Sequence, residues 1–473
     1  MGLETIIGLE IHVELDTKSK IFCSCSTEFG AKPNENTCPI CIGLPGTLPV
    51  LNEEVVNLAI KAGTALNCNI NMINKTDRKN YFYPDLPKAY QISQYDMPIC
   101  TGGWIEIESG GKTKKVGITR IHIEEDAGKL IHLEDEPFTL VDYNRTGVPL
   151  IEIVTEPDLR SSEEAVAFLK ALKSILEYAE ISDCRMEQGS LRCDANISVR
   201  EIGQKDFNTK VEIKNLNSFK EVAKALEKEE RRQKELYNFG EGHKIKQETR
   251  KWDAGKGRTV SMRSKEDAHD YRYFPEPDLP PVTIKEELIN KIKKTLPELA
   301  SEKAKRFSQE YKLNEKDIDI LISSKEIADY FETVVSLGSE PKEASNWITV
   351  ELLRVMKQTE VIPVKAEQLA GLIKLVDKGT ISRSAAKEVF DELVSSDKDP
   401  EEIVKKRGLS QISSSDQLEE IIDSVLNQNS QAVEDYKNGK GKAIGFLIGQ
   451  IMKETKGKAN PNIAREILLE KLK

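Results

Sequence analysis

The feature that most constrains the fold is a period of two that recurs in five short segments. In the first, IIGLEIHVEL over residues 6–15, apolar residues alternate with Glu10, His12 and Glu14. This is the pattern of a β-strand with one face on a core. The other four segments are TRIHIE (119–124), PLIEIV (149–154), LRCDANISVR (191–200) and KVEIKN (210–215). We therefore expect a mainly antiparallel sheet with one apolar face.

The polar faces of these segments mix carboxylates with basic groups. They present Glu10, His12, Arg120, His122, Glu124, Glu152, Arg192, Asp194, Glu212 and Lys214. A solvated outer face explains any one strand, but such faces favour Lys and Thr over His, Asp and Asn. The five together favour a concave site for divalent cations, because Mg²⁺ prefers carboxylate oxygens and bridges to substrate phosphates. The interleaved Lys and Arg would neutralise phosphoryl oxygens during transfer.

The common nucleotide-binding motifs do not account for such a site. The sequence contains no G-x-x-x-x-G-K-[S/T], no G-x-G-x-x-G after a strand-like segment and no set of protein-kinase motifs. NGKGKAIG at 438–445 has the wrong spacing and is typical of a loop before a helix. A phosphoryl-transfer site would therefore be cradled by the sheet.

Four cysteines near the first strand-like segment form two pairs. Cys23 and Cys25 are separated by a short loop from Cys38 and Cys41. Two close pairs at this spacing can place four thiolates around one ion, as tetrahedral zinc requires. Four unrelated buried thiols are the alternative. With Cys at all four positions, the zinc site would be closed and structural.

The length of 473 residues exceeds what one hydrophobic core supports, so two or three domains are expected. The pattern up to about Pro281 indicates mixed α and β structure. One helix is predicted to begin after Ser161, where Glu164 completes a capping box, and another to run over about 219–237.

The second part of the chain has helical periodicity and little β signal. It follows the proline-rich segment YFPEPDLPPV (273–282), and an interruption is expected at 395–416. Lysines become frequent from Tyr436 onward, although the whole chain has a net charge of −10. Any contact with nucleic acid must therefore come from a local basic patch, or from a substrate that also carries metal-bound phosphate.

Two other segments are rich in charged and aromatic residues. RKNYFYPDLPKAYQISQYD (78–96) is expected to form an ordered loop, and QETRKWD (247–253) is explained by surface ion pairing. No apolar run approaches the length of a membrane span, and no signal peptide begins the sequence. These features predict a cytoplasmic protein.

Several motifs together resemble the B subunit of the tRNA-dependent Glu/Asp amidotransferases, the GatB/GatE family. They are IGLEIHVEL, DRKNYFYPDLPKAYQISQYD, IHIEEDAGK, NRTGVPLIEIVTEPD, SLRCDANISVR, EIKNLNSFK, QETR, DYRYFPEPDLPP and VEDYKNGKGKAIGFLIGQIMK. They occur in order along nearly the whole chain. The resemblance implies an α+β cradle related to glutamine synthetase over 1–292, with a zinc-binding loop at about 23–41. An all-α domain over 293–405 and a small, basic, YqeY-like all-α tail over 406–473 that contacts tRNA would follow.

The resemblance also implies a reaction. The B subunit would use ATP and Mg²⁺ to phosphorylate the side-chain carboxylate of Glu-tRNA(Gln) or Asp-tRNA(Asn). Ammonia from glutamine, supplied by an amidase-type A subunit, would displace the phosphate, and a small C subunit would complete a heterotrimer. A tRNA-binding scaffold and a stand-alone ligase of the glutamine-synthetase type are the alternatives. The sequence does not decide between Gln-tRNA and Asn-tRNA as product.

The resemblance assigns roles to particular residues. The catalytic set would be Glu10, His12, Glu125, Glu152, Asp194 and Glu212, and the Mg²⁺ ligands Glu10, His12, Glu124, Glu125 and Asp194. ATP and its phosphates would be bound by Lys79, Tyr81, Ser190, Arg192 and Lys214, and tRNA by Lys437, Lys440 and Lys442.

Overall fold

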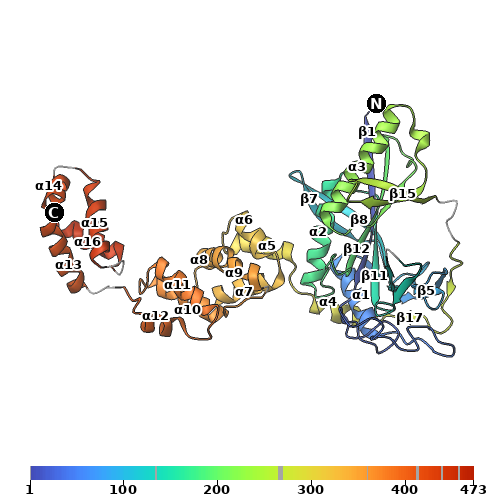
Figure 1. Ribbon diagram of the computed structural model, residues 1–473, viewed down its shortest axis with the longest axis horizontal. Helices are drawn as coiled ribbons and strands as arrows, with labels where there is room; N and C mark the ends of the chain where they lie inside the picture. The colour runs from blue at the N-terminus through green and yellow to red at the C-terminus, as the bar shows by residue number, and fades with distance from the viewer. Residues whose placement is uncertain are drawn as a thin grey trace. The chain divides into compact units, whose positions relative to one another are not determined.

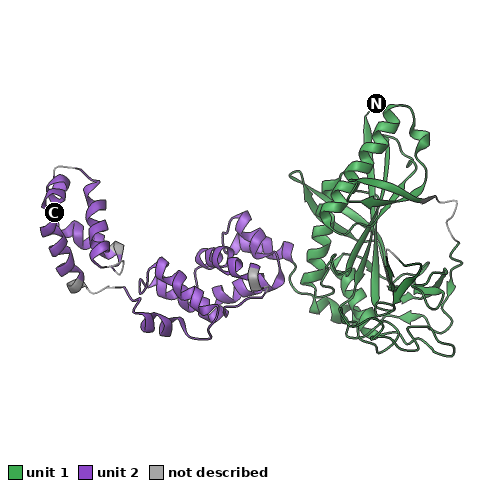
Figure 2. Cartoon of the chain, viewed as in Figure 1, with its two compact units in different colours: residues 1–299 green, residues 300–473 purple. Residues whose placement is uncertain are grey.

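The computed structural model describes residues 2–133, 136–264, 270–359, 361–411, 415–437, 440–455 and 459–472. It divides into two compact units, residues 1–299 and 300–473, each with its own hydrophobic core (Figure 2). The first unit is α+β and the second all-α in its described residues, which confirms the predicted fold class. No described helix is long and apolar enough to cross a membrane. A further division near residue 406 remains a prediction.

The first unit is built on a ten-stranded sheet (Figure 1). Its strands run in the order β15-β14-β13-β12-β1-β11-β8-β6-β2, and β7 pairs with β8. They are β1 (Leu3–Glu14), β2 (Asn69–Ile70), β6 (Cys100–Thr101), β7 (Trp104–Ser109), β8 (Lys112–Glu125), β11 (Pro149–Thr155), β12 (Leu191–Glu201), β13 (Val211–Lys214), β14 (Glu248–Asp253) and β15 (Arg258–Ser264). The pairs are antiparallel except β13 with β14, which confirms the expectation of a mainly antiparallel sheet.

The alternation in the sequence creates the hydrophobic core on one side of this sheet. Leu9, Ile11 and Val13 of β1 are buried there with side chains of three helices, such as Phe168 and Val222. The helices are α1 (Glu53–Ala65), α2 (Ser162–Tyr178) and α3 (Phe219–Asn238), and they contact β8, β7 and β12 respectively. Both predicted helices, α2 and α3, are confirmed. The polar residues of the alternating strands are left on the opposite side.

Three smaller sheets and two helical segments complete the first unit. The sheets pair β4 (Asp77–Asn80) with β5 (Tyr90–Ser93) and β16 (Phe274–Pro275), β9 (Lys129–His132) with β10 (Thr139–Asp142), and β3 (Ile73–Asn74) with β17 (Val282–Thr283). The helical segments are η1 (Gly242–Lys244) and α4 (Glu286–Thr295). The prediction of an ordered loop over 78–96 was wrong at 78–80 and 90–93, where β4 and β5 pair with each other and β4 also pairs with the distant β16. Strands this short show no clear local period.

The second unit is helical in its described residues. It contains α5 (Ala300–Glu310), α6 (Glu315–Leu321), α7 (Lys325–Ser336), α8 (Pro341–Asn346), π-helical η3 (Trp347–Leu352), α9 (Leu353–Thr359), α10 (Ala366–Asp377), α11 (Arg383–Leu393), α12 (Pro400–Arg407), α13 (Ser415–Gln428), α14 (Ser430–Lys437), α15 (Ala443–Glu454) and α16 (Pro461–Lys471). The interruption predicted at 395–416 contains α12. Its polar sequence is helical because Asp399 caps the start, Pro400 is the first residue and Gly408 ends the helix with a φ of +61°.

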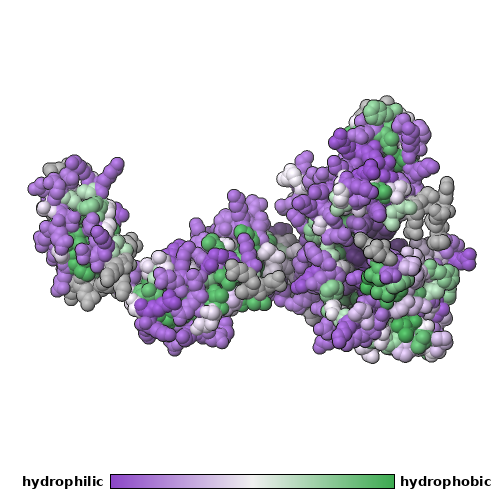
Figure 3. All heavy atoms as spheres, in the orientation of Figure 1, coloured by the Kyte–Doolittle hydropathy of each residue, from purple (hydrophilic) through white to green (hydrophobic). Residues whose placement is uncertain are grey.

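The surface of both units is mostly polar in the view of Figure 3, with a few apolar areas on each. The last four helices have a core of their own, which includes Leu418, Val425, Leu447, Ile451 and Leu468. This core gives the basic C-terminal segment a folded framework.

We expect Ser161→Ala to lower the free energy of unfolding by about 1 kcal/mol, because the Ser161 hydroxyl accepts a hydrogen bond from the Glu164 N–H at 3.2 Å and caps α2. Equilibrium urea unfolding, followed by circular dichroism, measures the change. Ser161→Thr keeps the hydroxyl and is the matched control. Equal losses in the two variants would contradict the role of the cap.

Candidate functional site

The register of four adjacent strands places polar side chains in one row across the sheet. His12 of β1 lies opposite Arg192 of β12 on one side and Glu152 of β11 on the other. Glu152 in turn lies opposite His122 of β8. These four residues all come from the polar half of the alternating segments, so the strand pairing alone brings them together.

Glu124, two residues beyond His122 on β8, completes a compact cluster. His12 Nε2 lies 3.3 Å from a Glu124 oxygen and 3.4 Å from a Glu152 oxygen. His122 Nε2 lies 3.6 Å and 3.2 Å from oxygens of the same two carboxylates. Ligand atoms of His12, Glu124 and Glu152 all lie within 4.8 Å of one another. Two carboxylates and an imidazole at this spacing suit a divalent cation that also binds phosphate.

Burial and charge pairing shape the protonation of this cluster. Burial alone would lower the pKa of His12, but its hydrogen bonds and attraction to Glu124 and Glu152 outweigh burial and raise it to about 10. The pKa of His122 is raised in the same way. Burial opposes ionisation of both carboxylates, yet the imidazoles hold the pKa values of Glu124 and Glu152 below the usual range. The carboxylates are thus kept ionised in a buried position.

A second polar row lies two residues further along the strands. Glu10 of β1 is opposite Asp194 of β12, and its carboxylate accepts a hydrogen bond of 2.8 Å from Asn196. Lys214 Nζ of β13 lies 2.6 Å from Asp194. A cavity of about 280 Å³ adjoins Glu10 and is lined by Asn196 among others.

Lys214 also joins Glu212 to this row, because its Nζ lies 3.2 Å from Glu212 Oε1. The other Glu212 oxygen accepts a hydrogen bond of 2.7 Å from the Thr249 hydroxyl of β14. Burial opposes the charge of Lys214, but Asp194 and Glu212 outweigh it and raise its pKa. Asp194 and Glu212 therefore share one partly exposed cation.

Tyrosines from the small β4–β5–β16 sheet and its flanks lie near the carboxylates of the cluster. The rings of Tyr81 and Tyr271 meet edge to face at 6.1 Å, and Lys79 Nζ lies 4.8 Å from the centre of the Tyr271 ring. Burial and the charges of Asp85 and Glu124 raise the pKa of Tyr81. The sequence-predicted Lys79 and Tyr81 thus lie together on one aromatic cluster.

Glu125 is not brought into the His12 cluster. It follows Glu124 on β8, and its carboxylate lies 2.7 Å from Lys88 Nζ and accepts a hydrogen bond of 2.8 Å from the Ile92 N–H. With Lys88 it lines a cavity of about 120 Å³ that also borders Cys23 and Cys41. Neighbouring residues of a strand point to opposite sides of the sheet, so Glu124 contacts the histidines whereas Glu125 contacts Lys88.

Arg192 and Ser190 have partners close to the row. A terminal nitrogen of Arg192 lies 2.8 Å from Asp126, which also lies 3.2 Å from Arg145 Nε. Ser190 is engaged in the turn that precedes β12, where its hydroxyl contacts Asp183 and accepts from the Arg185 N–H at 2.7 Å. Arg192 therefore borders the cluster, whereas Ser190 stabilises a turn.

The four predicted zinc ligands do converge. Sulfur atoms of Cys23, Cys25, Cys38 and Cys41 lie within 4.8 Å of one another. A hydrogen bond with Cys23 lowers the pKa of Cys41 to about 5, helped by the Cys38 N–H and the charge of Lys20 and opposed by burial. The same surroundings raise the pKa values of Cys23 and Cys25. Four cysteines at this spacing suit a tetrahedral metal ion, which binds them as thiolates.

The predicted tRNA-binding lysines lie at the end of α14 and the start of α15. Lys437, Lys440 and Lys442 are exposed, and Lys440 Nζ lies 2.9 Å from Asp435. Residues 438 and 439 between them lie outside the described residues.

Several residues of the site were absent from the predicted set. They are Thr249, Lys88, Asp126 and Arg145, whereas His122 was predicted on the polar face but was given no role. His122 carried a usable signal, because it alternates with Glu124 on the same strand. Thr249, Lys88 and Arg145 reach the site through pairings between distant segments, which no local pattern reveals.

Comparisons with known proteins agree with this geometry. The GatB/GatE catalytic domain matches residues 5–290, and a GatB domain matches residues 329–472. The aspartyl/glutamyl-tRNA(Asn/Gln) amidotransferase B subunit from Clostridium beijerinckii is 64% identical over 100% of this chain and 99% of its own length. The second protein of this kind from Clostridium acetobutylicum is 63% identical over 99% of both chains, and the one from Carboxydothermus hydrogenoformans is 58% identical over 99% of this chain and 98% of its own. The chain therefore belongs to the GatB/GatE family and is similar over nearly its full length to B subunits of these amidotransferases.

Proposed function

We propose that this chain catalyses the ATP-dependent step of tRNA-dependent transamidation. A side-chain carboxylate oxygen of glutamate on tRNA(Gln), or of aspartate on tRNA(Asn), attacks the γ-phosphorus of ATP and releases ADP. Ammonia then attacks the carbonyl carbon of the acyl phosphate, and inorganic phosphate leaves as the amide forms. The observation that carries the proposal is the cluster of His12, Glu124 and Glu152 on the polar sheet face of a family member.

Phosphorylation makes chemical sense of such a site. Hydroxide is a poor leaving group from a carboxylic acid, whereas phosphate is a good one. The carboxylate and the triphosphate repel each other, so the site must supply positive charge where they meet. Arg192 lies opposite His12, Lys214 pairs with Asp194 in the next row, and Lys79 lies on the Tyr271 ring. These cations are suited to orient phosphoryl oxygens.

The donor set fits a divalent cation. After His12 has lost its imidazole proton, His12, Glu124 and Glu152 would hold Mg²⁺. Glu10 and Asp194 in the next row are the other two carboxylates proposed as Mg²⁺ ligands. Mg²⁺ would offset charge on the transferring phosphoryl group. In the proposed reaction Glu212 keeps Lys214 in place, because Lys214 Nζ forms an ion pair with Glu212 Oε1 at 3.2 Å. Glu125, paired with Lys88, borders the site from the opposite side of β8.

Zinc in the Cys23–Cys25–Cys38–Cys41 cluster would be structural, because all four positions are thiols and no open coordination position remains. Ammonia would come from an amidase-type A subunit within a heterotrimer that also contains a small C subunit. The names of the relatives specify one component of an amidotransferase and Asp/Glu-tRNA substrates, which supports an assembly and a tRNA partner.

We expect Glu152→Gln to lower the rate of ATP-dependent amidation of Glu-tRNA(Gln) by about a hundredfold, because one buried charge of the cluster is lost. Glu156→Gln is the matched control, since Glu156 follows shortly in the chain and its carboxylate accepts a hydrogen bond from Thr119 outside the cluster. Amidation by the assembled enzyme with radiolabelled Glu-tRNA measures both. A Glu152→Gln enzyme with the rate of the control would refute the site.

Removal of a zinc ligand tests the cysteine cluster. Purified wild-type protein is expected to contain bound zinc by elemental analysis, and Cys38→Ser to lose most of it, because three thiolates bind the ion more weakly than four. Cys68→Ser removes a thiol outside the cluster and should leave the zinc content unchanged. Equal zinc contents in all three proteins would exclude the cluster as the site.

The basic tail is expected to bind tRNA through charge. Replacing Lys437, Lys440 and Lys442 by Ala should weaken tRNA binding and reduce the slope of log K against log salt by about 0.7–0.9 for each phosphate that the protein no longer neutralises. Replacing the exposed Lys305, Lys374 and Lys378 removes the same charge elsewhere. Filter binding over a salt series measures both triple variants. Equal tRNA affinities and equal salt slopes in the two would contradict the assignment.

A further inference from the structure

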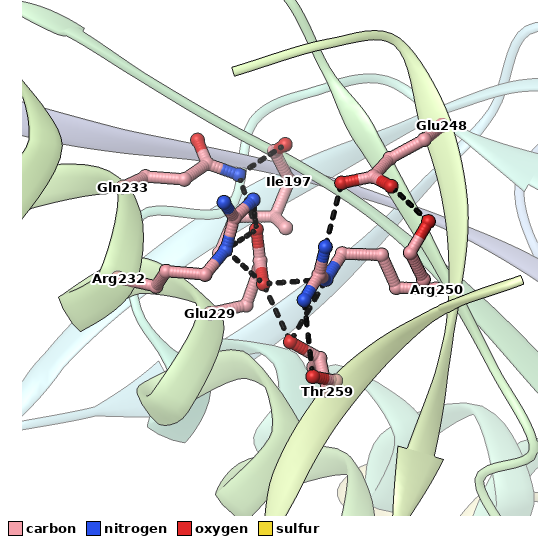
Figure 4. Close-up of polar contacts among 8 residues, drawn as sticks. Ile197, Glu229, Arg232, Gln233, Glu248, Arg250 and Thr259 are labelled. Carbon is pink, nitrogen blue, oxygen red and sulfur yellow. Dashed lines mark hydrogen bonds and ion pairs between the residues drawn. The ribbon is translucent and has the colours of Figure 1, made fainter. Parts of the chain in front are cut away.

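A buried charge cluster lies between α3 and the β14–β15 strands (Figure 4). Its centre is Glu229 of α3, whose side chain is 0% exposed. One Glu229 oxygen lies 2.6 Å from an Arg232 nitrogen, and the other accepts a hydrogen bond of 2.8 Å from the Thr259 hydroxyl. Gln233 donates to Glu229 at 3.0 Å. A carboxylate this deeply buried is tolerated only because its oxygens are so fully paired.

Arg250 of β14 connects this cluster to both strands. Its Nε lies 3.5 Å from Glu229 and donates to the Thr259 hydroxyl at 3.1 Å. One terminal nitrogen donates to the Thr259 carbonyl at 3.0 Å, and the other lies 2.6 Å from Glu248. The planar guanidinium thus binds α3, β14 and β15 at once, which an ammonium could not do in the same geometry. The segment QETRKWD is therefore not explained by surface ion pairing.

The neighbour of Arg250 reaches the other side of the sheet. Thr249 lies opposite Glu212 and Arg250 opposite Ile213 in the parallel β13–β14 pair. The Thr249 hydroxyl donates to Glu212 at 2.7 Å on the polar face, and Glu212 contacts Lys214 at 3.2 Å. Arg250 points to the face covered by α3. A shift of β14 by one residue would exchange the two sides and remove Thr249 from Glu212.

The strand pairing by itself defines this register weakly. β13 has four residues, and only three of them pair with β14. The pairing of β14 with β15 contains a register shift between Thr249 and Arg250. Such a bulge redirects the side chains beside it, so additional contacts are needed to hold the strand in one register.

We propose that Arg250, bound by Glu229 and Thr259, is a positioning residue for the transamidation reaction. It fixes the register of β14, so that Thr249 holds Glu212 and, through Glu212, the Lys214–Asp194 ion pair on the reaction face. The role rests on the proposed ATP-dependent reaction, but it concerns residues that do not touch the reacting groups. Arg232 binds the same Glu229 from α3 and has no place on β14, so it provides a natural comparison.

A double-mutant cycle in the assembled enzyme tests the proposal. Thr249→Val, Arg250→Lys, the double variant and Arg232→Lys are compared in kcat/KM for amidation of Glu-tRNA(Gln) with ATP and in thermal unfolding. We expect Thr249→Val and Arg250→Lys each to lower kcat/KM about tenfold, the scale of a lost hydrogen bond to a charged group. The double variant should be no worse than the more impaired single variant, because Arg250 acts through Thr249. Arg232→Lys should lower the unfolding temperature with little effect on kcat/KM.

The proposal would be overturned if the losses of kcat/KM in the two single variants multiplied in the double variant. It would also be overturned if Arg232→Lys and Arg250→Lys had equal thermal stability and lost kcat/KM to the same extent. If Arg250→Lys does not fold, Glu248→Gln replaces it in the cycle, because it removes one partner of Arg250 at a partly exposed position. A wild-type enzyme without ATP-dependent amidation would refute the proposed function itself. An active wild-type enzyme with an additive cycle would refute only the positioning role.

Discussion

The pairing register of β12, β1, β11 and β8 is the constraint on which the rest of the structure depends. It aligns Arg192, His12, Glu152 and His122 in one row and sends the intervening apolar residues into the core beneath α1, α2 and α3. The same alternation of polar and apolar residues therefore places the core on one face of the sheet and the site on the other. A slip of one residue would bury the charged face and expose the apolar one, so the energy of the core also enforces the geometry of the site.

The charges on this face are stabilised by pairing. Glu124 and Glu152 face two imidazoles, Asp194 and Glu212 share Lys214, and Asp126 lies between Arg192 and Arg145. Each of these charged side chains is fixed by its strand or by an ion pair to a residue on or next to a strand. The side chains therefore need to move little when a charged substrate binds. Preorganised charge of this kind is how proteins stabilise transferring phosphoryl groups. The buried cluster around Glu229 extends the same principle to the opposite side of the sheet.

Sequence patterns predicted the strands and the zinc cluster well because both signals are local. The period of two marks β1, β8, β11 and β12, and the Cys spacing marks four thiols that do converge. The pattern could not separate Glu124 from Glu125, since adjacent acidic residues at a strand end leave open which one faces the cluster. Nor could it find Thr249, whose partner Glu212 lies far away in the sequence, or the β4–β5–β16 sheet, whose strands have only two to four residues. The residues that begin and end α12 are recognisable in the sequence, but its polar composition gives no hydrophobic period that would predict a helix.

The most direct measurement follows oxygen from the substrate. Glu-tRNA(Gln) labelled with ¹⁸O in the side-chain carboxylate is amidated by the assembled enzyme with ATP and glutamine, and the inorganic phosphate is analysed by mass spectrometry. An acyl phosphate requires that a labelled oxygen leave with the phosphate when ammonia attacks the carbonyl carbon. We predict ¹⁸O-labelled phosphate in amounts equal to the amide formed. Unlabelled phosphate accompanying full amidation would contradict activation of the carboxylate by phosphorylation.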